Sequence, residues 1–105
     1  MTDHNQRITL FRGRYQKDRK KLKWARDQVV VLNNKISDLG VRLMRAKGES
    51  NPTFRYTLSL QLVTVESLRN MYYEYVCQKR TDLKATSERI IEEQLLQAED
   101  MFQSL

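Results

Sequence analysis

The sequence predicts an all-α protein, a long antiparallel helical hairpin that dimerises into a four-helix bundle or coiled coil. Apolar residues recur at alternating steps of three and four, which is the spacing of a helix face and not of a strand. Only three glycines and one proline occur in 105 residues, too few for the many turns of a sandwich or barrel. The strongest turn signal, at residues 48–52, divides the chain into halves of nearly equal length.

The first helix is expected over about residues 7–47. Asp18 is the single polar interruption of its apolar seam. A glycine costs a helix about 1 kcal/mol relative to alanine. The helix is therefore expected to begin either near residue 7 or at Gly13, with residues 1–12 then looser or in a short helix. The seam consists of Ile8, Phe11, Tyr15, Leu22, Ala25, Val29, Leu32, Ile36, Leu39, Leu43 and Ala46.

The turn is expected at residues 48–52 and the second helix over about residues 53–103. Gly48 suits the C-cap of the first helix, while Asn51 and Pro52 suit the N-cap and first position of the second. The second helix has a comparable apolar face, formed by Leu58, Leu62, Val65, Leu68, Tyr72, Val76 and Leu83.

The apolar face of the second helix thins at residues 77–82, where a break is one alternative. A third helix would then begin near Leu83. In either case the chain is expected to form one helical domain over residues 1–105. The last segment carries a seam rotated slightly from the earlier one, at Ile91, Leu95, Ala98, Phe102 and Leu105.

A hairpin folded at about residue 50 brings together residues whose numbers sum to roughly 101. Phe11 then opposes Ile90, and Asp18 falls within a turn of Lys79 and Arg80. Two helices cannot bury every apolar side chain of the second half, which favours a homodimer.

Basic residues are concentrated in the first half of the chain. The net charge is +6, and residues 1–52 carry 13 basic and 5 acidic side chains against 6 and 8 in residues 53–105. The register makes both helices basic at the end away from the turn. Like charges that face each other cost stability unless an anion lies between them, so function is expected there. The predicted nucleic-acid-binding residues are Arg12, Arg14, Lys17, Arg19, Lys20, Lys21, Lys23, Trp24, Arg26, Lys79, Arg80, Lys84 and Arg89.

The expected partner is nucleic acid, with duplex RNA favoured. Lysine and arginine at several helix positions suit phosphate contacts without base readout, and an extended helical face suits the shape of duplex RNA. One alternative is a structural coiled-coil module that docks a helical protein partner, with the basic residues merely solvated. Another is an acidic membrane surface or an acidic protein. No apolar run approaches about 18 residues, so no membrane span is expected.

Trp24 lies next to the basic run and has two alternative interpretations. Its spacing relative to Val31 places it on the side of the first helix away from the hairpin core. It would there either stack on a ribose or base, or form a dimer contact with Val30 and Val31.

Catalytic and metal-binding motifs are missing from the sequence. There is no carboxylate pair, Ser-His-Asp set, Gly-rich phosphate loop or metal-ligand spacing, so no enzymatic activity, cofactor or metal is expected. The single cysteine, Cys77, favours a reducing compartment, and the N-terminus leads into no signal-type apolar segment. An intracellular location is expected, with the cytoplasm favoured and the nucleus as the alternative.

In layout and charge the chain resembles the small double-stranded-RNA-binding suppressors of RNA silencing of nodavirus-type insect viruses. The features that carry the resemblance are the helix–GESNP–helix layout, the length of 105 residues and the basic run from Arg12 to Arg26. The resemblance implies a viral helical dimer that binds duplex RNA without sequence preference. It rests on no residue motif and assigns no role to a single residue, and the hairpin here is longer than expected for that family.

Overall fold

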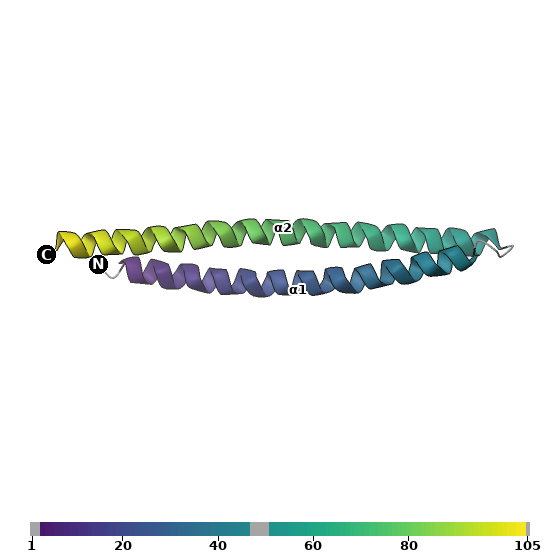
Figure 1. The fold of residues 1–105 in the computed structure, drawn as a ribbon, viewed down its shortest axis with the longest axis horizontal. Helices are drawn as coiled ribbons and strands as arrows, with labels where there is room; N and C mark the ends of the chain where they lie inside the picture. Colours follow the sequence, from purple (N-terminus) through teal and green to yellow (C-terminus); the bar gives the residue numbers. More distant parts are fainter. Residues whose placement is uncertain (1–2, 47–50, 105) are drawn as a thin grey trace. The chain divides into compact units, whose positions relative to one another are not determined.

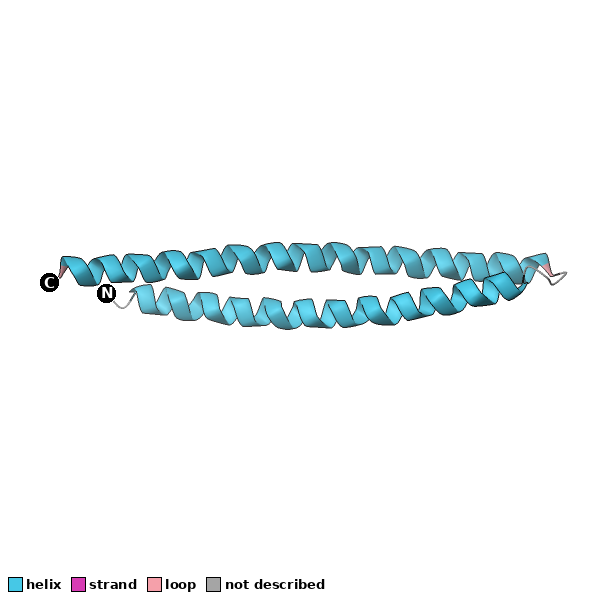
Figure 2. Ribbon diagram, in the orientation of Figure 1, coloured by secondary structure: helices cyan, strands magenta, loops and turns pink. Residues whose placement is uncertain are grey.

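The computed structural model of the chain describes residues 3–46 and 51–104, which form two helices, α1 (Asp3–Ala46) and α2 (Pro52–Gln103) (Figure 1). Every described residue except Asn51 and Ser104 is helical, and these ranges contain no strand (Figure 2). Two compact units are defined by contacts: unit 1 comprises Met1–Lys23 and Cys77–Leu105, and unit 2 comprises Trp24–Val76. Within each unit a segment of α1 pairs antiparallel with a segment of α2, which confirms the all-α helical hairpin.

The start of α2 follows the predicted cap. The Asn51 side-chain Oδ1 accepts a hydrogen bond from the Phe54 backbone N–H at 3.2 Å, which satisfies one of the free donors of the first turn. Pro52 is the first helical residue, where its missing N–H costs nothing. The expected C-cap at Gly48 and the rest of the turn, residues 47–50, lie outside the described residues.

Helix α1 begins at Asp3, earlier than either residue 7 or Gly13. Its first turns are tied to α2, because His4 lies 2.7 Å from Glu93 and Asn5 accepts a hydrogen bond from Gln97 at 2.7 Å. These cross-helix contacts outweigh the weak helix propensity of Gly13, which lies inside the helix.

Helix α2 is helical throughout residues 77–82, so no third helix begins near Leu83. Polar contacts replace the missing apolar ones in this segment. Gln78 donates a hydrogen bond to Asp82 at 3.0 Å, and Lys79 pairs with the same carboxylate at 3.3 Å. Pairs three and four residues apart stabilise a helix locally.

The predicted register is confirmed in both units. In unit 1 the Arg89 guanidinium lies over the Phe11 ring, and in unit 2 Arg69 donates a hydrogen bond to Asn33 at 3.3 Å. The residue numbers of each pair add up to roughly 101, as an antiparallel hairpin folded near residue 50 requires.

The apolar core lies mainly in unit 2. Among the described residues, two that are buried, Ile8 and Leu22, belong to unit 1. Six belong to unit 2, namely Ala25, Val29, Leu32, Ala46, Leu58 and Val76.

The seam of α2 differs from the prediction at Leu68, which is 41% exposed. Arg69 takes the seam position instead and is half-buried. Its guanidinium bonds to Asn33 and lies 5.7 Å from the ring centroid of Tyr73. A long arginine can lie along a seam with its aliphatic stem packed and its guanidinium at the edge. The Nε atom of Arg69 is nevertheless buried without a hydrogen-bond partner.

The last segment of α2 also differs from the prediction. Ile91, Leu95 and Phe102 are 54%, 62% and 76% exposed and do not face α1. The side of α2 that faces α1 is polar, because Glu93 and Gln97 bond to the first turns of α1. The rotated apolar series from Ile91 to Phe102 is therefore an outward stripe of α2, and Leu105 lies outside the described residues.

Candidate nucleic-acid interface

Eleven of the predicted binding residues fall in unit 1. The other two, Trp24 and Arg26, belong to unit 2. The unit 1 set consists of Arg12, Arg14, Lys17, Arg19, Lys20, Lys21, Lys23, Lys79, Arg80, Lys84 and Arg89. All of these except Lys79 are exposed, and among residues 3–46 and 51–104 none except Lys79 is in an ion pair. Their charges are therefore available to an external anion.

Lys79 occupies the seam and differs from the other ten. Its ammonium lies 3.4 Å from Asp18 Oδ1 and 3.3 Å from Asp82 Oδ2. The Lys79 and Asp18 side chains are only 16% and 19% exposed. Lys79 therefore neutralises the one polar interruption of the α1 seam and does not face solvent.

Nine of the ten exposed cations fall on two sides of the seam, and Lys20, which neither follows nor precedes a seam residue, lies on the outer face of α1. A residue that directly follows a seam residue is turned about 100° to one side, and a residue that directly precedes one is turned to the other. Because the helices run antiparallel, the following residues of both helices share one side. That side carries Arg12, Arg19, Lys23, Arg80 and Lys84, and we call it the five-cation side. Within the described part of unit 1, no aspartate or glutamate occupies it.

The opposite side of unit 1 has mixed charge. Arg14 of α1 and Arg89 of α2 both lie over the ring of Phe11, at 5.9 Å and 5.7 Å from its centroid. Such cation–π contacts hold the two guanidinium groups in place. A depression of about 240 Å³ beside them is also lined by Asp18 and Asp82. The two carboxylates weaken the attraction of this side for a polyanion.

A polar cluster joins the first turns of α1 to the last part of α2 in unit 1. The Nδ1 and Nε2 atoms of His4 lie 2.7 Å from Glu93 and 2.7 Å from Asp100, and Arg7 pairs with Glu93 at 3.2 Å. The hydrogen bond to Glu93, followed by that to Asp100, raises the pKa of His4. The hydrogen bond from His4 is in turn the largest cause of a lowered pKa at Glu93. These carboxylates are therefore engaged away from the five-cation side.

This cluster was not predicted from the sequence. The first residues were expected to be loose, which left His4 without a role. The register itself contained a signal, because positions 4 and 97 sum to roughly 101 and the acidic residues 93 and 100 lie within one turn of position 97.

Trp24 does not lie on the far side of α1 from the core, and that prediction is wrong. Its ring meets the ring of Tyr72 on α2 edge to face, with the centroids 5.5 Å apart and 67° between the planes. Trp24 directly precedes Ala25, the most deeply buried seam residue, so its large ring reaches across to α2. The indole remains 52% exposed.

The described residues offer no metal site, because no group of three or more His, Cys, Asp or Glu side chains is placed to hold an ion. Across the same ranges, neither helix has an apolar stretch long enough to span a bilayer. Cys77 is an exposed free thiol.

Comparison with known proteins assigns the chain to no family. No protein-family model, no curated protein and no solved structure matches it.

Proposed function

We propose that the chain is a non-enzymatic protein that binds nucleic acid without sequence preference, with double-stranded RNA as its preferred ligand. The observation that supports this function is the five-cation side of unit 1. There Arg12, Arg19 and Lys23 of α1 share one side with Arg80 and Lys84 of α2, with no described carboxylate among them. A ligand with regularly repeated phosphates matches such a surface, because phosphate contacts need positive charge and no base readout.

The size of the surface fits a few phosphates of a duplex. Along α1, the stretch from Arg12 to Lys23 spans about 17 Å. Double-stranded RNA offers a rigid helical partner a wide, shallow minor groove with phosphates and 2′-hydroxyls at its edges. Five neutralised phosphates give a slope of log affinity against log salt of about −4.5 for a duplex.

Binding is tested with labelled duplex RNA, duplex DNA and single-stranded RNA of equal length, by fluorescence anisotropy. We expect duplex RNA to bind most tightly and its affinity to fall about 500-fold between 50 and 200 mM salt, as the slope above requires. A wild-type chain that binds none of the three at 50 mM salt would falsify the proposed function.

A pair of triple variants tests where the duplex binds. Arg12→Gln, Arg19→Gln and Arg80→Gln together remove three charges from the five-cation side. Their matched control, Arg14→Gln, Lys21→Gln and Arg89→Gln, removes three charges from the same helices on the opposite side. We expect the first variant to lose at least about 100-fold in affinity, the salt slope to flatten by nearly 3, and the control to lose much less. Circular dichroism checks that both remain helical.

A second candidate function is a coiled-coil module that docks a helical protein partner. The outward stripe of unit 1 favours it, because Ile91, Leu95 and Phe102 are exposed with Ala98 between them at steps of four and three. The double variant Leu95→Glu and Phe102→Glu separates the two functions. It should abolish capture of a protein partner and leave duplex binding unchanged.

A further inference from the structure

Unit 2 exposes more large apolar side chains than unit 1 does. Of the 18 large apolar side chains that are exposed in the described residues, 12 belong to unit 2. Helices that are apolar on more than the face they turn to each other usually pack against a further neighbour. The exposed apolar side chains of unit 2 therefore favour packing against a further chain.

One side of unit 2 combines exposed apolar groups with an aromatic contact. Trp24 and Val31 of α1 directly precede seam residues, as do Leu68 and Met71 of α2, so all four share one side. Their exposed fractions are 52%, 48%, 41% and 66%. We call this the Trp24 side. Tryptophan and tyrosine are enriched among the residues that dominate binding at protein interfaces. The ring of Trp24 is held in position by its edge-to-face contact with Tyr72.

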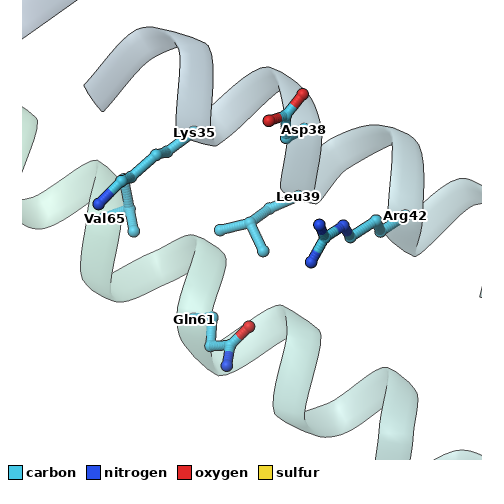
Figure 3. A pocket seen from close by; sticks show the side chains of 6 residues that line it. All are labelled: Lys35, Asp38, Leu39, Arg42, Gln61 and Val65. Carbon is cyan, nitrogen blue, oxygen red and sulfur yellow. The ribbon is translucent and has the colours of Figure 1, made fainter. Parts of the chain in front are cut away.

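The same side continues into a groove of about 270 Å³ that carries three charges without ion pairs. Figure 3 shows Lys35 and Arg42 of α1 extending toward α2 on either side of Leu39. Asp38, between them in the sequence, also lines the groove. Within the described residues, none of the three forms an ion pair. One carboxylate flanked by two cations is self-complementary, since across a two-fold axis the carboxylate of each set can pair with a cation of the other.

We propose that the Trp24 side of unit 2 is the interface between two copies of this chain. Trp24, Val31 and Leu68 of each copy pack against their counterparts. Asp38 of one copy faces the partner's Lys35 or Arg42, and the symmetry gives two such ion pairs. The interface lies wholly in unit 2, so it does not rest on the proposed nucleic-acid function. It also assigns Trp24 to the dimer contact and not to base stacking.

The oligomeric state is measured by sedimentation equilibrium, in reductant because the exposed Cys77 could form a disulfide. We expect the wild-type mass to be twice 12.6 kDa. Val31→Glu with Leu68→Glu places two charges on the Trp24 side and should give the monomer mass. The matched control, Val30→Glu with Val63→Glu, makes the same change on the opposite side of both helices, where each side chain is 59% exposed. It should remain a dimer.

A charge exchange tests the pairing without touching an apolar residue. Asp38→Arg alone should raise the dissociation constant at least about tenfold, and so should Lys35→Asp with Arg42→Asp, because like charges then meet across the axis. An equal mixture of these two variants should restore the dimer as a heterodimer. The proposal is overturned by a monomeric wild type, by a Val31→Glu, Leu68→Glu variant that stays dimeric, or by a mixture that remains dissociated.

Discussion

Units 1 and 2 are built from the same two helices but use them differently. In the part of the chain that the structure describes, unit 2 buries six apolar residues between the helices and exposes apolar groups outside. Unit 1 there buries two, places polar pairs such as Asp18–Lys79 in its seam, and carries most of the exposed cations. An apolar seam stabilises a helix pair, whereas a polar pair within a seam specifies register at some cost in stability.

The comparison implies a division of roles within one short chain. The exposed apolar groups of unit 2 suit an interface with another protein chain, whereas the exposed cations of unit 1 suit a solvated polyanion. The three predictions below test the seams behind this division, from the largest expected effect to the smallest.

The apolar seam of unit 2 should carry the largest single contribution to stability. Leu58 is 4% exposed, so Leu58→Ala should lower the free energy of unfolding by about 3 kcal/mol through lost burial and a cavity. The matched control is Leu60→Ala, two residues along the same helix, where the side chain is 50% exposed. Its loss should be about 1 kcal/mol or less. Urea unfolding followed by circular dichroism measures both, and equal losses would contradict the position of the core.

The polar seam of unit 1 should behave differently under substitution. Lys79→Leu leaves Asp18 largely buried without its cross-helix cation and should cost about 1–3 kcal/mol. Adding Asp18→Leu removes the unpaired carboxylate and lets two apolar groups meet. The double variant should therefore lie within about 1 kcal/mol of the wild type or above it. Urea unfolding of Lys79→Leu, of Asp18→Leu and of the double variant gives the coupling energy between the two residues. If the two losses simply add, the pair is not acting as a unit.

Most of the fold could be predicted because α1 repeats its apolar spacing with little ambiguity. Asn51 and Pro52 likewise marked the start of α2 through local chemistry alone. The seam of α2 was ambiguous at Leu68 and Arg69, since either residue continues a spacing of three and four. Hydrophobicity favours Leu68, but Arg69 has Asn33 and Tyr73 as partners, and those partners are visible only when the helices are paired.

The candidate site was predictable as a set of charges but not as a surface. The sequence places the cations near one another once the register is known. Which side each one occupies depends on the phase of the seam, so Arg12 and Arg14, two residues apart, lie on opposite sides. The roles of Lys79 and Trp24 depend on contacts with the other helix, which apolar spacing alone does not reveal.

The smallest expected effect is a pH dependence at the end of unit 1. The pKa of His4 is raised above 6.5 in the folded chain, so its contribution to stability is complete below pH 6.5 and is lost as the pH rises through the folded value. The pKa of Glu93 is lowered from 4.5, so its contribution is present above pH 4.5 and is lost as the pH falls through the folded value. Both contributions are therefore present together between pH 4.5 and 6.5.

His4→Gln isolates this contribution, because glutamine keeps a polar group but cannot be charged. The difference in Tm between wild type and variant should be largest between pH 4.5 and 6.5 and should shrink on either side. Asn5→Ala is the matched control, since it removes the neutral hydrogen bond with Gln97 in the same turn and should lower Tm equally at every pH. An NMR titration of the His4 ring gives its pKa directly. If Tm falls equally for His4→Gln at about pH 5.5 and about pH 8.5, the His4 contacts hold unit 1 by packing and not by charge.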